Sequence, residues 1–352
     1  MENKSKSTAA GKDGITYAYL FLSRDALDPF LLQILNFIGK KRKLPKTMTE
    51  VMIKLLPKKN NLTNLKNWRP ISLMNTSTKI IAACINNRIV EVIPHIVGDT
   101  QFGFVKQRNI DQGINLVQKV RYELNQKHNV REGDDQHIAA LSIDFEKAFD
   151  RSNFKYFETV LRKLKFPEST INQILALTSL QHGQVIINNN ISDGFFEFGN
   201  GIRQGSPLSP SIFLLIIEPM IFNCLNFIEV FSPFENKVIR SISYADDVTL
   251  LIKNQEELNQ VINNFQKYED VSNMKINLDK SNLIYMKEDI WLKESYVEEF
   301  EESPIKNIRL SDAKEITFLG VPFNGEYDWK TKFEKIQKQL WFSLLPNVPL
   351  NV

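Results

Sequence analysis

The chain has 352 residues, a formal net charge of +3 at pH 7 and 43% hydrophobic residues, which is ample for a folded core. This length allows two or three compact units or one larger enzyme body. The two cysteines, Cys84 and Cys224, are far apart, which excludes a disulfide framework and a cysteine zinc module. Residues 1–12 lack the apolar core of a secretory signal, and the longest apolar run, Ile212–Ile217, is too short to cross a membrane. An intracellular protein without a membrane partner is therefore expected.

The N-terminal third combines predicted elements with a basic strip. A frayed leader over 1–11 is followed by a predicted helix over 30–37 that ends near Gly39, a strand over 51–57 and a helix over 72–92. The apolar face of the last helix consists of Ile80, Ile81, Cys84, Ile85 and Ile89. Between Lys40 and Lys59, eight basic residues accompany a single acid, Glu50. Such a strip suits either a bound polyanion or an ordinary solvated surface.

The remaining elements alternate between strands and helices. Their predicted order is a strand over 138–145, helices over 154–164 and 169–180, a hairpin of 184–188 with 195–198, a helix over 210–227, a second hairpin of 238–244 with 248–252, and a helix over 256–268. Residues 287–303 are acidic and are expected to form an exposed connection. This order predicts an α+β fold with an antiparallel sheet rather than a doubly wound one.

The most informative motif is Tyr244-Ala245-Asp246-Asp247, at the tip of the second predicted hairpin. Two adjacent carboxylates between apolar strands need a counter-ion, and a divalent metal that serves nucleotidyl transfer is an obvious one. A solvated Asp-Asp turn is the alternative. If the strand that ends at Asp144 lies beside this hairpin, three carboxylates meet and can hold two Mg²⁺ ions. Alternatively, Asp144 only caps the segment that follows it.

Three motifs in a fixed order resemble motifs A, B and C of reverse transcriptases. They are 144–150 (Asp-Phe-Glu-Lys-Ala-Phe-Asp), 201–210 (Gly-Ile-Arg-Gln-Gly-Ser-Pro-Leu-Ser-Pro) and 244–247 (Tyr-Ala-Asp-Asp). Residues 67–73 and 101–104 resemble the fingers blocks of non-LTR (LINE-type) retrotransposon enzymes, and 276–281 and 318–320 resemble motifs D and E. The order of several motifs is far more specific than any one of them.

This resemblance implies a right-hand polymerase fold, with fingers and an antiparallel palm sheet over 12–323 and the start of an incomplete thumb over 324–352. The implied activity is that of an RNA-directed DNA polymerase, which extends a primer 3′-hydroxyl with dNTPs on an RNA template. The implied cofactors are two Mg²⁺ ions, with Mn²⁺ as a substitute, and the partners are template RNA, DNA primer and dNTPs.

The resemblance also implies roles for residues of motifs A and C. Asp144, Asp246 and Asp247 would bind the metal ions, with Asp246 as the more direct ligand, and the main-chain carbonyl of Phe145 would complete the shell. The ring of Phe149 would lie under the incoming sugar and leave no room for a 2′-hydroxyl. An ordinary core aromatic is the alternative for Phe149.

Further implied roles concern the nucleotide and the primer. The residues that would contact the nucleotide are Lys58, Arg69, Gln204 and Gly205. Lys280 would be the general acid that protonates pyrophosphate, or else a surface lysine. Leu319 and Gly320 would form the primer grip.

Other functional classes share part of this pattern. An RNA-dependent RNA polymerase also has paired aspartates, and Asp150 lies where such an enzyme has a ribose-binding aspartate, but Phe149 and motif B favour a reverse transcriptase. A group II intron-type reverse transcriptase/maturase has the same catalytic motifs, although no maturase extension is evident. The non-enzymatic alternative is a catalytically inactive, truncated or domesticated RNA-binding relic. The short segments outside 12–323 leave no room for an endonuclease, an RNase H domain or a Cys-rich knuckle, so a truncated element or gene-model fragment is expected.

Overall fold

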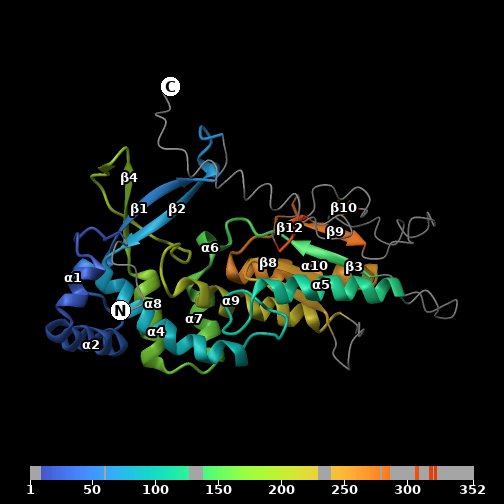
Figure 1. The fold of residues 1–352 in the computed structure, drawn as a ribbon, viewed down its shortest axis with the longest axis horizontal. Helices are drawn as coiled ribbons and strands as arrows, with labels where there is room; N and C mark the ends of the chain where they lie inside the picture. The colour runs from blue at the N-terminus through green and yellow to red at the C-terminus, as the bar shows by residue number, and fades with distance from the viewer. Residues whose placement is uncertain are drawn as a thin grey trace.

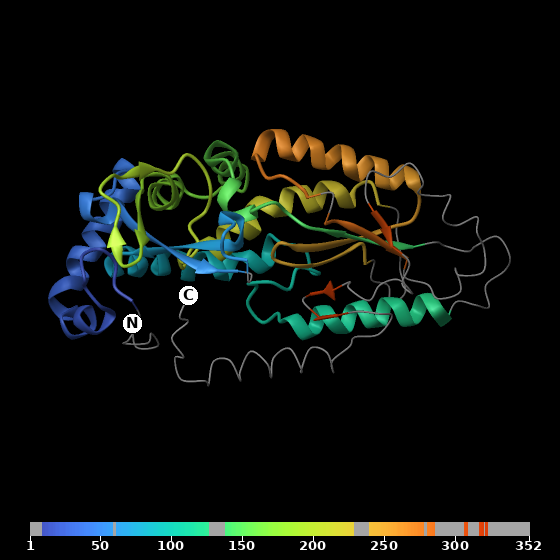
Figure 2. The ribbon, with the colours of Figure 1, turned by 90° about the horizontal axis from the view of Figure 1, so that it is seen from above.

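The computed structural model describes residues 9–58, 61–126, 138–228, 239–277, 280–285, 306–308, 317–319 and 321–322. Two larger β-sheets occupy different parts of an elongated molecule, and helices pack against both (Figures 1 and 2). The first sheet has the strand order β2-β1-β4-β5, with β6 also paired to β4. The central sheet has the order β10-β9-β3-β8-β7. The expected α+β class is confirmed.

The elements up to residue 95 build the first sheet and one wall of the core. They are α1 (Tyr17–Leu22), α2 (Arg24–Lys41), α3 (Lys46–Thr49), β1 (Glu50–Pro57), the 3-10 helix η1 (Leu65–Asn67), β2 (Trp68–Met74), α4 (Thr76–Val92) and the 3-10 helix η2 (Ile93–His95). The helix predicted over 30–37 is thus part of the longer α2, and the strand predicted over 51–57 is confirmed.

The elements after residue 95 supply the central sheet, its covering helices and the rest of the first sheet. The helices are α5 (Ile110–Gln126), α6 (Ala148–Arg151), α7 (Phe154–Lys163), α8 (Glu168–Ser179), α9 (Ser209–Leu225) and α10 (Gln255–Ser272). The strands are β3 (Ala139–Ile143), β4 (His182–Ile187), β5 (Asn190–Ile191), β6 (Phe196–Glu197), β7 (Ser241–Tyr244), β8 (Asp247–Ile252), β9 (Asn282–Tyr285), β10 (Lys306–Ile308), β11 (Thr317–Phe318) and β12 (Val321–Pro322). No element was assigned to α5 from the sequence.

The predicted helix over 72–92 is wrong at its start. Ser72 to Met74 belong to β2, which pairs antiparallel with β1 along its whole length, from Val51↔Met74 to Pro57↔Trp68. The helix begins only at Thr76, because Asn75 has an extended backbone and its buried amide donates to the carbonyl of Thr47. Pairing with β1 satisfies the backbone of these residues and outweighs their helical spacing.

Two further expectations for this half of the molecule are corrected. Cys84 was placed on the buried face of its helix, but it is exposed and borders an open cleft between α2 and α4. The hairpin predicted for 184–188 with 195–198 turns earlier than expected, because Asn188 and Asn189 have positive φ and lead directly into β5. The later strand, β6, pairs with the beginning of β4.

The central sheet is the middle of three layers, with α5 on one face and α9 and α10 on the other (Figure 2). Along β3, Ala139, Leu141 and Ile143 pack with the core that contains α9 and α10, whereas Ala140 packs with the core that contains α5. Successive side chains of a strand point to opposite faces, so a strand covered on both faces is apolar throughout. This burial fixes the register in which β3 and β8 meet.

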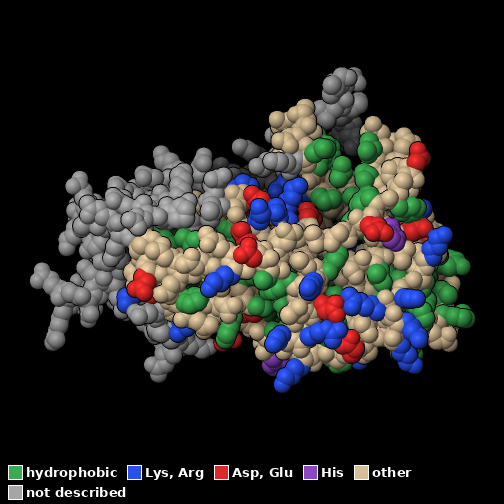
Figure 3. Space-filling view, turned by 180° about the vertical axis from the view of Figure 1, so that it is seen from behind, with side chains coloured by type: hydrophobic (Ala, Val, Ile, Leu, Met, Phe, Trp, Pro, Cys, Tyr) green, Lys and Arg blue, Asp and Glu red, His purple; other side chains and the backbone are tan. Residues whose placement is uncertain are grey.

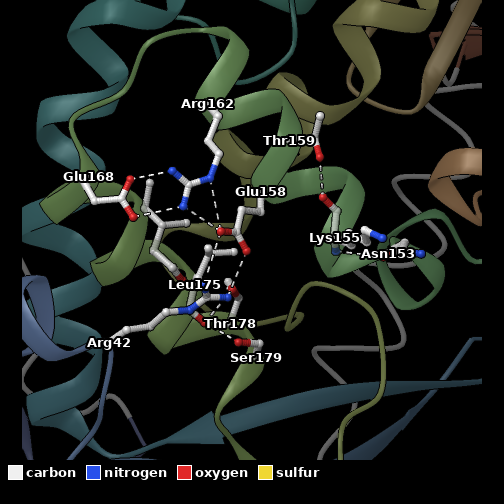
Figure 4. A network of polar contacts seen from close by, with 11 residues as sticks. Arg42, Asn153, Lys155, Glu158, Thr159, Arg162, Glu168, Leu175, Thr178 and Ser179 are labelled. Atoms are coloured by element: carbon white, nitrogen blue, oxygen red, sulfur yellow. Dashed lines mark hydrogen bonds and ion pairs between the residues drawn. The ribbon is translucent and has the colours of Figure 1, made fainter.

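A network of charged side chains joins the end of α2 to helices α7 and α8 (Figure 4). Arg42 ends α2 in a left-handed conformation, and its guanidinium lies 3.1 Å from the Glu158 carboxylate of α7. Arg162 donates to the same carboxylate and also to Glu168, at 2.6 Å. These hydrogen bonds, led by those from Arg162, lower the pKa of both Glu158 and Glu168. Every charge in this network thus has a protein partner.

The end of the molecule that holds α1 and α2 exposes apolar side chains among basic ones (Figure 3). Those on these two helices are Tyr19, Leu22, Phe30, Leu32 and Phe37. Within the part of the chain that the structure describes, no helix combines the length and apolar character needed to cross a membrane. Residues 1–8 of the predicted leader over 1–11, the acidic segment 287–303, Gly320 and the thumb segment 324–352 lie outside the described residues.

Candidate active site

The pairing of β3 with β8 brings distant acids to one end of the central sheet. The two strands are antiparallel neighbours, and the last pair in their register is Ile143↔Val248. Asp144 follows β3 directly, and Asp247 begins β8. These two acids, far apart along the chain, therefore emerge side by side at the same sheet end, as the sequence motifs predicted.

The turn between β7 and β8 carries the third acid. Tyr244 pairs with Asp247, so Ala245 and Asp246 are the two residues at the tip of the turn. Ala245 has φ of +56°, in the left-handed region that residues with a side chain rarely adopt. Such a backbone persists only where its surroundings hold it in place.

The electrostatics of these acids show that their ionised forms disfavour one another. Burial, followed by the negative charge of Asp246, raises the pKa of Asp247 to about 6. The N–H of Leu319 donates to Asp247 and opposes this rise. Asp246 is exposed at the tip of the turn, yet its pKa is also raised, first by desolvation and then by the charge of Asp144. Carboxylates whose ionised forms are disfavoured in this way favour a nearby cation.

Two basic residues of the first sheet face the acids across the site. The charges of Lys58 and Arg69 both lower the pKa of Asp246, which places them within electrostatic reach of it. Lys58 follows β1, and its N–H donates to the carbonyl of Asn67, whereas Arg69 lies exposed on β2 opposite Leu56. The acids and the two cations therefore come from different sheets of the fold.

The donor set at this site suits a hard divalent cation. Carboxylate oxygens are the ligands that Mg²⁺ prefers, and Mg²⁺ is usually held by one or two carboxylates together with substrate phosphates. Among the residues described by the structure, no three acidic, His or Cys side chains stand close enough to form a complete metal cage. The carboxylates present thus fit a divalent cation that they would hold only in part.

Phe149, the expected sugar-contacting residue, lies on α6, the short helix that follows Asp144 in the chain. Its ring stacks on that of Phe213, with centroids 4.5 Å apart and an angle of 19° between the planes. Phe213 is fully buried in α9, whereas Phe149 is half-buried. The stacked geometry fixes the plane of the Phe149 ring. Its role as a selector of sugars stays a prediction.

The loop that precedes α9 holds Gln204 and Gly205 between the two sheets. The N–H of Ser72, on β2, donates to the carbonyl of Gln204 at 2.7 Å. Gly205 has φ of +109°, and a Cβ atom there would lie 2.7 Å from the Ser72 carbonyl oxygen, so glycine is required. The Gln204 amide donates to Asp150 at 3.2 Å. Asp150 thus contacts a neighbouring residue of the site, a role that was not foreseen.

Arg203, which is buried, holds the same loop in place. Its guanidinium lies 3.4 Å from the centroid of the Phe198 ring and donates to the carbonyls of Asn200 and Thr178. Burial lowers the pKa of Arg203 to about 9, and the charge of Asp150 opposes this shift. A buried cation that grips two carbonyls and a ring stabilises the loop rather than a substrate.

The remaining predicted residues lie around the same sheet end. The Lys280 ammonium is 3.8 Å from the Asp144 carboxylate, and both side chains are about half exposed. Leu319 is buried with positive φ, and its N–H contacts Asp247, so it lies against the acids themselves. Phe145 is buried and forms an isolated bridge with Ile276. The roles of these residues stay predictions.

Gln101 is the functional candidate to which no role was assigned from the sequence. It belongs to the 101–104 motif, yet its side chain contacts the backbone of the Tyr244–Asp247 turn. The signal available in the sequence was a glutamine close to a glycine within one motif. Only the fold shows that this glutamine is buried and which turn it contacts.

Together, a central sheet that is antiparallel except for β9 and β10 and that carries three acids at one end, the helices behind it and the two cations of the first sheet fit the right-hand polymerase fold. The family model described as reverse transcriptase (RNA-dependent DNA polymerase) matches residues 56–323. The match covers most of the chain, which therefore belongs to the reverse transcriptase family.

Similar proteins place it with the non-LTR retrotransposons. The chain is 30% identical over 319 residues to the Transposon TX1 uncharacterized 149 kDa protein of Xenopus laevis, covering 90% of this chain and 23% of that protein. It is 24% identical over 281 residues to the retrovirus-related Pol polyprotein from type-1 retrotransposable element R2 of Popillia japonica, covering 78% of this chain and 37% of that one. The chain thus spans less than two fifths of either relative.

The fold also resembles a solved structure. Telomerase from Candida albicans, in complex with a fragment of telomeric RNA, matches with a TM-score of 0.51 and 12% identity, over 72% of this chain and 45% of that one. At this identity the likeness concerns the fold alone, and it agrees with the predicted right-hand polymerase architecture.

Proposed function

We propose that this chain catalyses RNA-templated DNA synthesis, in which a primer 3′-hydroxyl is extended with dNTPs. The observation that carries this proposal is the meeting of Asp144, Asp246 and Asp247 at one sheet end, opposite Lys58 and Arg69. An acidic cluster that faces a basic one matches a nucleoside triphosphate with its metal ions: the acids favour the cations and the basic residues favour the phosphates.

The proposal assigns the first sheet to the fingers and the central sheet to the palm, within residues 12–323. Asp144, Asp246 and Asp247, with the carbonyl of Phe145, would hold two Mg²⁺ or Mn²⁺ ions. When bound, such ions acidify the attacking hydroxyl and neutralise charge on the departing phosphates.

In the proposed reaction, the primer 3′-oxygen forms a bond to the α-phosphorus of the dNTP, and the bond from that phosphorus to the bridging oxygen breaks. Lys58 and Arg69 orient the triphosphate, while Gln204 and Gly205 border the nucleotide and template. The hydroxyl proton leaves to solvent, and Lys280 would protonate the departing pyrophosphate, a role supported by its distance of 3.8 Å from the Asp144 carboxylate. Leu319, next to Asp247, would help to position the primer end together with Gly320.

The decisive experiment is extension of a DNA primer on an RNA template with dNTPs and Mg²⁺. We expect the unmodified chain to extend the primer and Asp246→Ala to lose extension, while the affinity for primer–template changes little. Extension by Asp246→Ala at the normal rate would refute the metal assignment. Retention of RNA binding without extension by the unmodified chain would favour an RNA-binding relic instead.

The sugar-selecting role of Phe149 has its own test. Phe149→Val opens the space beside the sugar and should weaken the preference for dNTPs over rNTPs by about 10–200-fold, the range expected for small steric changes in a binding pocket. Phe213→Leu leaves the ring in place but removes its stacking partner, so it should weaken the preference less. Competition between dCTP and CTP in single-nucleotide extension measures both. An unchanged preference in Phe149→Val would reject the role.

A further inference from the structure

Residues 100–103 lie along the free edge of β7, directly before the acidic turn. Gln101 forms an isolated parallel bridge with Ser243. The N–H of Phe102 donates to the Ser243 carbonyl at 2.8 Å, and the N–H of Ser243 donates to the Thr100 carbonyl at 2.9 Å. This segment therefore continues the central sheet by a short stretch of backbone pairing, and it ends beside Ala245.

The Gln101 side chain reaches from this segment into the turn itself. Its Oε1 accepts hydrogen bonds from the N–H of Ala245, at 2.9 Å, and from the N–H of Gly103, at 3.0 Å. Two backbone donors converge on one atom, which must therefore be the amide oxygen and not the nitrogen. The Gln101 side chain is 2% exposed, so water does not compete for these bonds.

Two features show that this contact is specific. Within the described residues, the Gln101 Nε2 is buried and has no hydrogen-bond partner, a situation that costs free energy. The residue therefore suits this position through its oxygen alone. A Cβ atom on Gly103 would clash with the backbone of Tyr244 and Ala245, so the close approach of the two segments depends on glycine.

We propose that Gln101 is a positioning residue for the acidic turn: its Oε1 holds the left-handed Ala245 and so fixes the direction in which Asp246 and Asp247 present their carboxylates. This inference rests on the function proposed for those two acids. Gln101 is buried, and its effect passes through the backbone of the turn. Misplacing reactive groups by about 1 Å can cost on the order of 10²-fold in rate.

The first test replaces Gln101 with methionine, which has similar length but no amide oxygen. We expect Gln101→Met to lower the kcat of primer extension by about 10²-fold. The KM for dNTP should stay near its normal value, because Arg69 and Lys58 are untouched, and the Mg²⁺ concentration for half-maximal activity should rise. A merely structural role would lower thermal stability without changing the Mg²⁺ dependence.

Gln173→Met is the matched control. Gln173 is also a buried glutamine whose amide contacts a remote backbone, donating to the Leu35 carbonyl at 3.1 Å, but it joins α8 to α2. It should lose stability with an unchanged kcat and Mg²⁺ dependence. If Gln101→Met gives too little folded protein, Gln101→Asn provides the second comparison, since it keeps the amide but is one methylene shorter.

Two measurements separate this inference from the proposed function without using activity. Mn²⁺ binding, followed by electron paramagnetic resonance, should weaken in Asp246→Ala and, to a smaller degree, in Gln101→Met. Amide hydrogen exchange at Ala245 should speed up in Gln101→Met and not in Gln173→Met.

Each outcome decides one question. One outcome would overturn the positioning role and leave the proposed function intact. In it, Gln101→Met binds Mn²⁺ normally and exchanges normally at Ala245, while Asp246→Ala binds Mn²⁺ more weakly. Normal Mn²⁺ binding by Asp246→Ala would refute the metal assignment and the positioning role together.

Discussion

Two clusters of charge in this protein have opposite properties. In the network of Arg42, Glu158, Arg162 and Glu168, each acid accepts from an arginine and has a lowered pKa. At the end of the central sheet, Asp246 and Asp247 repel each other, and both have a raised pKa. The first cluster is complete without any ligand, whereas the second favours a cation from outside.

The difference shows how to separate a structural cluster from a functional one. Glu158 and Glu168 form ion pairs with arginines of neighbouring helices. These ion pairs stabilise the packing of those helices. The acids of the central sheet are instead held by backbone features, a strand end and a left-handed turn, and the cations that lower the pKa of Asp246 come from the first sheet. Perturbed acids of this kind are typical of sites that bind charged ligands.

The largest expected effect comes from Asp247→Asn. This change keeps the shape of the side chain and removes its charge, so primer extension should fall by about 10³-fold or more, as several kcal/mol of charge stabilisation are lost. The metal-free variant should nevertheless be more stable than the unmodified protein at pH 7.5, by about 1–3 kcal/mol, because it no longer buries a repelled charge.

The sign of this stability change follows from proton binding. The folded pKa of Asp247, about 6, lies above the ordinary value of 3.8, so the folded state holds the proton more tightly. The contribution of Asp247 to stability is complete below pH 4 and is lost as the pH rises through about 6. Thermal unfolding of the unmodified protein and of Asp247→Asn in EDTA, between pH 4 and pH 8, measures this change in stability. Equal stability of the two proteins at pH 7.5 would contradict the prediction.

A smaller effect is expected from Arg69→Ala, which removes one cation opposite the acids. The KM for dNTP should rise by roughly 10-fold, because a charge-assisted contact to phosphate contributes about 1.5–3 kcal/mol. Lys54→Ala is the matched control, since Lys54 is also an exposed cation of the first sheet but does not influence Asp246. Steady-state extension at varied dNTP concentrations distinguishes the two variants. If Arg69→Ala and Lys54→Ala have the same KM for dNTP, Arg69 does not bind the triphosphate.

The smallest effect is expected from Arg42→Gln in the complete network. Glu158 keeps its bonds from Arg162, and partly exposed ion pairs contribute only about 0–1 kcal/mol. Thermal unfolding should therefore change slightly, and extension and its Mg²⁺ dependence should not change. A large loss of extension would show that this network shapes the active site, and the contrast between the two clusters would no longer hold.

The sequence predicted those elements in which local pattern and tertiary contacts agree. The buried strand at β3 and helices α7, α8, α9 and α10 were predicted close to their observed bounds. The start of the helix over 72–92 was wrong because Ser72 to Met74 pair with a strand of the same sheet, which local spacing does not reveal. The exposed Cys84 was misplaced because an open cleft, and not a packed neighbour, adjoins that side of α4.

The sequence by itself determined the family, through the order of its motifs, and it determined which acids to examine, because adjacent carboxylates between apolar strands are costly without a cation. Only the tertiary structure decided that Lys58 and Arg69 face Asp246, that Phe213 supports Phe149 and that Gln101 holds Ala245. These contacts join residues that are far apart along the chain. They depend on strand register and helix packing, which no local pattern of residues encodes.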